Sequence, residues 1–182
     1  MSKKVNHIIE KCIKGDQKSQ MHLYDLYCEA MFCAANRYLK NEEEAKDAMQ
    51  DGFIKAFTKL ETFNGTVSFG AWLKKIIINQ CIDVLKRNRV ETISIEEQVL
   101  EVVDDESWKF DIKYSKETII NAIHSLKDKY KLILQLYLIE GYDHIEISEI
   151  AEIPIKTSRT NLRRGKILLR EVLKKGKSEA RY

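Results

Sequence analysis

The sequence predicts an all-α protein of two small helical domains joined by an extended acidic linker. Its 182 residues include only seven glycines and one proline, whereas sandwiches and barrels need many tight turns. Hydrophobic residues make up 44% of the chain, which is enough for a core and argues against wholesale disorder. Helical hydrophobic spacing fills both ends of the chain and is lost in the middle. We therefore expect four helices, a linker and four further helices.

Three helices are predicted before residue 61. Helical spacing spans residues 5–14 and 21–39, with Gly15-Asp16 as the stop between them. Asn41 is expected to cap a third helix, because three glutamates follow it where the helix dipole favours negative charge. The side chains that this third helix should bury are Ala45, Ala48, Met49, Phe53, Phe57 and Leu60.

A fourth helix is predicted from Ser68, its N-cap, to about Arg87. A loop at residues 62–67, centred on Asn64-Gly65, precedes it. At 100° per residue, apolar side chains fill one half of the helix. They are Phe69, Trp72, Leu73, Ile76, Ile77, Cys81 and Val84.

The polar edge of this fourth helix suits a single nucleic-acid strand. Lysine and arginine side chains on it could follow phosphates, while bases stack on an aromatic ring or enter the preceding loop. The alternative is the ordinary polar face of an amphipathic core helix. The candidate contacts are Phe63, Asn64, Lys75, Asn79, Asp83, Lys86 and Arg87.

A linker is predicted over residues 89–115, because helical periodicity is lost there. The stretch from Glu91 to Glu106 holds seven acidic residues and no lysine or arginine. The predicted organisation is therefore a domain over residues 1–88, the linker, and a second domain over residues 116–182.

The second domain is predicted to contain a helix-turn-helix. Asp143 is a good N-cap for its short helix, and Pro154 cannot continue that helix. Ile147, Ile150 and Ala151 should face inward. Helices are expected at residues 119–126, 129–139, 143–152 and about 157–174, with turns at 140–141 and 153–156.

The last predicted helix is strongly basic. Residues 156–177 hold nine basic residues and one acidic residue, although the net charge of the chain is only +3. This asymmetry indicates a polyanionic partner. With Leu162, Leu169 and Leu173 on the core side, the other face could bind phosphates and base edges. A solvated basic helix is the alternative. The candidate contacts are Lys156, Thr157, Arg159, Thr160, Arg163, Arg164 and Lys166.

The third helix carries a small acidic patch. Asp47, Gln50 and Asp51 are spaced at i, i+3 and i+4 and therefore form neighbours on one face. A docking patch for a basic helical partner is one interpretation, and a solvated helix face is the other. A metal site is disfavoured because no histidine lies near.

The sequence shows no catalytic arrangement, so we expect no enzyme activity, metal or cofactor. The four histidines lie in different elements, and phosphate-binding glycine loops and nucleophile elbows are missing. No apolar stretch is long enough to span a bilayer, and the first residues do not resemble a signal peptide. We expect a cytoplasmic protein with its four cysteines as reduced thiols, acting as small buried hydrophobes.

Four segments in this order resemble the extracytoplasmic-function group of bacterial RNA polymerase sigma factors. The first pairs Ile13-Lys14-Gly15-Asp16 with Leu23-Tyr24-Asp25-Leu26-Tyr27. The others run from Glu44 to Phe53, from Phe69 to Asp83 and from Gly141 to Leu169. The resemblance covers nearly the whole chain.

The resemblance implies a factor that directs core polymerase to specific promoters and assists strand opening. Asp47, Gln50 and Asp51 would bind the polymerase clamp, and the second domain would meet the flap. The loop at residues 62–68 would hold a flipped base of the −10 element, beside Asn79 and Asp83. The basic helix would contact the −35 duplex. The linker would thread the polymerase interior, and an anti-sigma factor would be a further partner.

Three residues depart from the family pattern. Glu152 replaces the usual glycine of the helix-turn-helix turn, where a positive φ would cost about 1 kcal/mol. Tyr137 replaces an arginine that contacts phosphate, and Asn161 replaces an arginine of the recognition helix. The promoter sequence therefore does not follow from the relatives.

Two other classes of protein remain as alternatives. A conventional helix-turn-helix regulator would dimerise on a palindromic operator without polymerase, and would need neither the acidic patch nor the long linker. A helical adaptor that binds only proteins would show no salt-dependent affinity for DNA.

Overall fold

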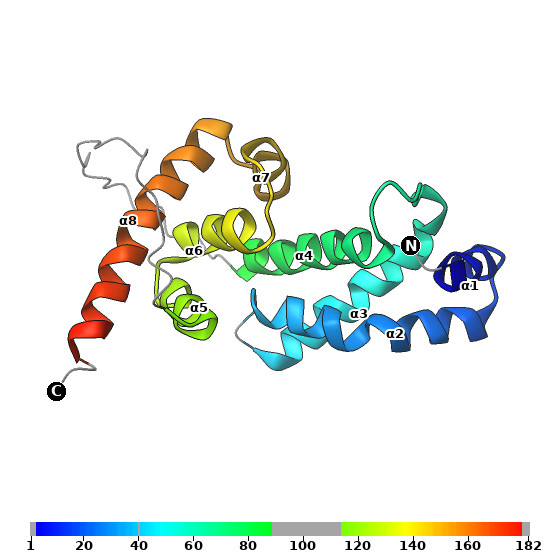
Figure 1. Ribbon diagram of the computed structural model, residues 1–182. Helices are drawn as coiled ribbons and strands as arrows, with labels where there is room; N and C mark the ends of the chain where they lie inside the picture. Colours follow the sequence, from blue (N-terminus) through cyan, green and yellow to red (C-terminus); the bar gives the residue numbers. More distant parts are fainter. Residues whose placement is uncertain (1–2, 40, 89–113, 180–182) are drawn as a thin grey trace. The chain divides into compact units, whose positions relative to one another are not determined.

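The computed structural model describes residues 3–39, 41–88 and 114–179 (Figure 1). The chain divides into unit 1, Met1–Ile93, and unit 2, Ser94–Tyr182. Every regular element in the described residues is helical, which confirms the predicted fold class. The predicted linker lies outside the described residues except for Tyr114 and Ser115.

The described residues of unit 1 form four helices and a short 3₁₀ turn. They are α1 (Lys3–Ile13), α2 (Gln17–Asn36), α3 (Glu42–Thr58), η1 (Leu60–Thr62) and α4 (Phe69–Asn88). Two of the predicted caps are confirmed. Asn41 Oδ1 accepts from the backbone of Glu43 at 2.8 Å, and Ser68 Oγ accepts from Ala71 at 3.2 Å. Helix α2 begins four residues earlier than predicted, because the Asp16 carboxylate caps it by accepting from the Ser19 backbone at 3.3 Å.

Helix α4 packs against both α2 and α3, so more of its surface is buried than predicted. Ile78, Gln80 and Ile82 are buried together with the predicted Leu73 and Ile77. The expectation of a single apolar half was too narrow, because helices cover α4 from two sides. Close contact to α3 depends on Gly52, where an added Cβ would lie 3.3 Å from Ile77 Cα and closer still to its Cδ1.

Within residues 114–179, unit 2 forms four helices and a π-helical segment. They are α5 (Lys116–His124), α6 (Asp128–Leu134), the π-helical η2 (Gln135–Ile139), α7 (His144–Ala151) and α8 (Ile155–Glu179). The predicted helix at 129–139 is thus continuous but widens at its end, where the Glu140 backbone donates to Gln135 at 3.1 Å. Gly141, at φ 77°, then ends it.

Helix α8 packs against α5, α6 and α7. Leu162, Leu169 and Leu173 are buried as predicted. Gly165 lets α8 approach α6, since a Cβ there would lie 3.1 Å from Leu134. Two polar side chains are also buried on the other helices: Lys131 binds Asp128 at 2.6 Å, and Gln135 lies 3.2 Å from His124.

The predicted helix-turn-helix is present as α7, a turn and α8. Asp143 caps α7 in a capping box with Glu146. Glu152 adopts the left-handed conformation, with φ 53° and ψ 46°, as its replacement of glycine implied. Helix α8 begins two residues earlier than predicted, because proline is well tolerated at a helix start and Pro154 accepts from the Ser158 backbone at 3.0 Å.

The cysteines only partly match the expectation. Cys12 and Cys81 are buried, but Cys28 is half-buried and Cys33 is exposed, so the prediction of buried hydrophobes is wrong for Cys33. Burial raises the pKa of the Cys81 thiol to about 12, which keeps it protonated.

Candidate docking and nucleic-acid interfaces

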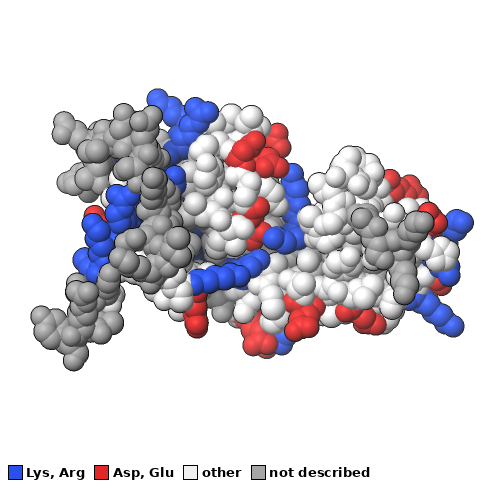
Figure 2. All heavy atoms as spheres, in the orientation of Figure 1, with Lys and Arg blue, Asp and Glu red and all other residues white. Residues whose placement is uncertain are grey.

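The acidic patch lies on the exposed face of α3. Asp47, Gln50 and Asp51 are all exposed. Figure 2 shows carboxylate side chains gathered along the edge of unit 1 formed by α2 and α3. A hydrogen bond from α4 orients the carboxylate of Asp51, since Gln80 Nε2 donates to its Oδ2 at 3.1 Å.

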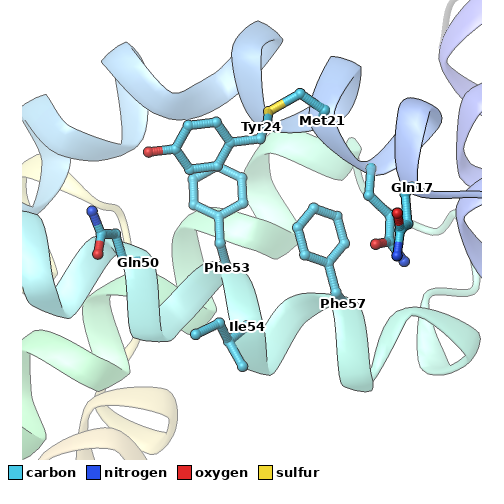
Figure 3. A pocket seen from close by; sticks show the side chains of 8 residues that line it. Gln17, Met21, Tyr24, Gln50, Phe53, Ile54 and Phe57 are labelled. Atoms are coloured by element: carbon cyan, nitrogen blue, oxygen red, sulfur yellow. The ribbon is translucent and has the colours of Figure 1, made fainter.

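An open groove of about 380 Å³ adjoins this patch (Figure 3). It lies between α2 and α3, and its lining is mainly apolar. Met21 and Ile54 are exposed at 63% and 62%. The rings of Tyr24 and Phe53 lie 4.7 Å apart on its inner side, and Gln50 belongs to both the patch and the groove. The sequence prediction did not include this groove.

A chain of polar contacts crosses from α3 to α4, and we call it the amide bridge. Its centre is Gln80, which is only 5% exposed. Gln80 donates to Asp51 and accepts a hydrogen bond from Lys55 Nζ, which also lies 3.6 Å from Asp83. The amide bridge therefore links the acidic patch to Asp83, a predicted nucleic-acid contact.

The loop before α4 is ordered by its own side chains. Asn64 Oδ1 accepts from the backbone and hydroxyl of Thr66 at 3.1 and 2.8 Å. Phe63 is half-buried, with its ring 5.5 Å from Phe69 and 5.4 Å from Trp72. Phe63 thus belongs to an aromatic cluster and presents only part of its ring to a ligand.

The polar edge of α4 has unequal exposure. Lys75, Asp83 and Arg87 are exposed, whereas Lys86 and Asn79 are half-buried. Asn79 Oδ1 is buried and accepts no hydrogen bond from the described residues. An unpaired buried oxygen costs about 1–3 kcal/mol, so this amide calls for an explanation.

The basic face of α8 also has unequal exposure. Lys156, Arg159 and Thr160 are exposed, and the remaining predicted contacts are half-buried: Thr157, Arg163, Arg164 and Lys166. Figure 2 shows basic side chains along α8. Asn161 is only 9% exposed, so this departure from the family pattern lies at a position that packs inward.

Tyr137, the second departure, lies beside the start of α7. Its ring is 5.2 Å from that of His144, and Lys166 Nζ lies 5.6 Å from its centroid. His144 Nδ1 is 2.9 Å from Ser158 Oγ. Lys166, Tyr137 and His144 therefore form one cluster. The sequence prediction did not place these three residues together.

The described part of the chain shows no group of three or more histidine, cysteine, aspartate or glutamate residues placed to hold a metal ion. None of the described helices has the length and apolarity needed to cross a bilayer.

Comparison with known proteins decides the family. Residues 23–91 match the family described as Sigma-70 region 2, and residues 116–169 match Sigma-70, region 4. The ECF RNA polymerase sigma factor SigW of Bacillus subtilis (strain 168) is 31% identical over 177 residues, which cover 91% of this chain and 95% of SigW. The chain belongs to the extracytoplasmic-function (ECF) sigma factors. It is therefore an RNA polymerase sigma factor.

Further relatives agree with this assignment. The ECF sigma-E factor of Escherichia coli (strain K12) is 25% identical over 170 residues, 87% of this sigma factor and 88% of that protein. The sigma factor RpoE of Bartonella quintana, solved with the anti-sigma factor NepR, has a TM-score of 0.53 at 21% identity and covers 85% of this chain and 96% of that one. That structure supports the shared fold.

The two family matches also separate this sigma factor from a conventional helix-turn-helix regulator. Such a regulator needs only the segment that corresponds to residues 116–169, whereas the match to Sigma-70 region 2 covers most of unit 1. The comparisons thus favour the sigma factor over the alternative.

Sequence reasoning missed several features beside the predicted sites. The exposed apolar side chains of Met21 and Ile54 were a signal, since neither belongs to the predicted core stripe. The sequence indicated the role of Gln80 only weakly: it is a polar residue two positions from both Ile78 and Ile82. Nothing in the sequence indicated the contact between His144 and Ser158, because they are fourteen positions apart.

Proposed function

We propose that this sigma factor divides promoter recognition between its units, with three surfaces in separate roles. Unit 1 docks on core RNA polymerase through α3 and captures an unpaired −10 strand through α4 and its preceding loop. Unit 2 grips the −35 duplex through α8. The observation that carries the proposal is the exposed basic face of α8 behind a capped helix-turn-helix, in a chain whose other unit carries the acidic patch.

The docking surface combines the acidic patch with the apolar groove. Its proposed occupant is a basic helix of core polymerase, such as the clamp presents, with an apolar side chain seated in the groove. Charge complementarity to Asp47 and Asp51 supports this occupant, as does Gln50, which joins the patch to the groove. Ile54 and Met21 would lose their exposure on docking, which is a favourable hydrophobic change.

The strand-capture surface consists of Phe63, Asn64, Lys75, Asn79, Asp83, Lys86 and Arg87. The ordered loop supports capture, because it is already shaped before a base arrives. Asn79 supports it as well: if its half-buried amide turned toward a bound base, the unpaired Oδ1 would gain a donor and an existing cost would be removed. Lys75 and Arg87 would follow phosphates.

The duplex-binding surface consists of Lys156, Thr157, Arg159, Thr160, Arg163, Arg164 and Lys166. Second helices of helix-turn-helix units lie in the major groove with their first turns against base edges. Arg159 and Thr160 occupy the first turns of α8 and are exposed. Arg163, Arg164 and Lys166, one to two turns later, would contact backbone phosphates.

The proposal also covers the domain bounds, the location of the protein and its regulation. The domains would be residues 1–88 and 116–182, with residues 89–115 as a linker through the polymerase. The protein would act in the cytoplasm, perform no bond chemistry and need no cofactor. An anti-sigma factor would control it, as suggested by the structures of RpoE with NepR and of CnrH with CnrY, the latter at TM-score 0.50 and 19% identity.

Paired substitutions in the acidic patch test the docking claim. Asp47→Ala with Asp51→Ala should weaken binding to core polymerase by about 30–900-fold, since two charge contacts of about 1–2 kcal/mol each add up to about 2–4 kcal/mol. Affinity for duplex DNA should not fall. Glu149→Ala with Glu171→Ala, an equal charge change at exposed positions of unit 2, is the matched control. Unchanged affinity for core polymerase would remove the docking claim.

A further inference from the structure

A cluster of four side chains ties the first residue of α7 to α8. The rings of His144 and Tyr137 stack 5.2 Å apart, with 31° between their planes. His144 Nδ1 lies 2.9 Å from the hydroxyl of Ser158, which is fully buried. Lys166 Nζ lies 5.6 Å from the centroid of the Tyr137 ring. Only Lys166 belongs to the proposed duplex-binding surface.

We propose that His144 is a further contact to the backbone of the bound duplex, and that it takes up a proton as a phosphate binds. This inference rests on the proposed binding of duplex by unit 2. In helix-turn-helix units the first helix crosses the DNA backbone. His144 opens that helix. The Asp143 carboxylate already accepts from the backbone N–H groups of Ile145 and Glu146, so the ring of His144 itself would make the phosphate contact. Arg159 and Lys166 of the proposed duplex-binding surface act on the same ring, which places it beside that surface.

The charged form of His144 has partners ready in the free protein. In an imidazolium ring both nitrogens carry hydrogen, so Nδ1 donates to Ser158 Oγ and Nε2 is left to donate to a ligand. A serine hydroxyl both donates and accepts, so the bond to Ser158 survives in either state of the ring. The Tyr137 ring beside it favours a cation. Protonation therefore breaks no existing contact.

Burial and the neighbouring cations favour the neutral form of His144 in the free protein. Burial lowers the pKa of His144, and the cations Arg159 and Lys166 on α8 lower it further, whereas Asp143, the cap of α7, raises it. On η2 the facing group is the uncharged ring of Tyr137. Glu140 and Glu146 act instead on Tyr142, whose pKa they raise together with burial.

A phosphate group reverses this balance. Its negative charge offsets Arg159 and Lys166 and adds an acceptor for Nε2–H, both of which favour the imidazolium. The proton comes from solvent. Since duplex binding raises the pKa of His144, affinity must increase as the pH falls through the pKa of the complex, and must level off below the pKa of the free protein. A rise of one pKa unit corresponds to a tenfold gain in affinity.

The direct test is an NMR titration of His144 in the full chain, with and without a duplex selected from a random pool by the protein itself. The expected result is a higher pKa in the complex, with an upward shift of about one unit. His22, an exposed residue of unit 1, serves as the internal reference. A His144 pKa that is unchanged or lowered on binding would overturn the inference.

Binding measurements give an independent test. Between about pH 8 and about pH 6, affinity for the duplex should rise by about 3–10-fold in the unmodified chain and clearly less in His144→Gln, with His22→Gln as the matched control. The slope of log K against log salt should steepen by about 0.9 at the lower pH only where His144 is present. Identical pH profiles and salt slopes for the chain and His144→Gln would refute the role of His144.

These tests separate the inference from the proposed function. A duplex that binds through Arg159 and Arg164 without any proton uptake would refute the His144 contact and leave duplex binding by unit 2 intact. A chain that selects no duplex from the pool would overturn both.

Discussion

Helices α4 and α8 are both proposed to bind nucleic acid, yet the protein holds them in different ways. Helix α4 is packed by α2 and α3, and even its polar residue Gln80 is 5% exposed. Helix α8 is also packed, by α5, α6 and α7, but basic residues follow one face over much of its length, with Lys156 and Arg159 exposed. Capture of a flipped base needs a shaped and rigid surface, because unstacking must be repaid by specific contacts. Duplex binding relies on long cationic side chains that adapt to a regular backbone.

Two glycines at helix–helix contacts, one in each unit, test whether α4 and α8 are packed differently, and the first of them has the largest expected effect. Gly52→Ala should lower the free energy of unfolding by about 1–2 kcal/mol, because its Cβ would press on Ile77 at the α3–α4 contact. Gly165→Ala should change it by less than about 0.5 kcal/mol, because its Cβ would meet only side-chain atoms, of Leu134 at 3.1 Å and of Tyr130 at 3.4 Å, and the helix gains propensity.

Thermal or denaturant unfolding of the full chain, followed by signals from each unit, measures both glycine variants. If Gly165→Ala proved the more damaging, α8 would be packed at least as rigidly as α4, and the contrast between the two helices would fail.

The amide bridge offers the next largest effect. Gln80→Leu should reduce affinity for core polymerase by a few-fold, since Asp51 loses its hydrogen bond from Gln80 and its preferred orientation. Stability should change by less than about 1 kcal/mol, because leucine is apolar and of similar volume.

A double-mutant cycle with Asp51→Asn separates the two explanations for Gln80. If Gln80 acts by orienting Asp51, the effects on polymerase affinity should be clearly less than additive. Additive losses would mean that Gln80 contributes only to the stability of unit 1.

The turn before α8 carries the smallest expected effect. Glu152→Gly should raise the free energy of unfolding by about 0.5–1 kcal/mol, because the left-handed conformation at φ 53° strains any residue with a Cβ. Differential scanning calorimetry would detect the increase. Lower stability would show that contacts of the Glu152 side chain outweigh the strain.

Local signals account for what the sequence could predict. The caps at Asn41, Ser68 and Asp143 depend on residues within a few positions of each other. The positive φ at Glu152 was expected from the family pattern instead, because glycine usually occupies that position. The acidic patch and the basic helix followed from spacing along one helix in the same way. Family resemblance supplied their roles, and the family itself is confirmed by the two matches that cover residues 23–91 and 116–169.

Contacts between distant segments account for what was missed. The groove needs α2 and α3 side by side, and the amide bridge joins residues 25 and 29 positions apart. The π-helical segment Gln135–Ile139 could not be predicted, because its apolar residues have the same spacing as in an α-helix. The exposure of Cys33 depends on how α2 packs, which composition does not show.

A promoter that has been opened in advance over its −10 element tests the division of labour most directly. On a closed duplex, holoenzyme carrying Arg159→Ala with Arg164→Ala should lose about 2–6 kcal/mol of promoter binding, since each arginine contact contributes about 1–3 kcal/mol. Lys75→Ala with Asn79→Ala should also impair open-complex formation.

On the pre-opened promoter, the α4 variant should stay defective, because it lacks contacts to the unpaired strand. The α8 variant should recover most of its transcription, because strand capture by unit 1 no longer depends on the initial grip on the duplex. Equal defects of the two variants on closed and pre-opened promoters would contradict the separate roles of the two units.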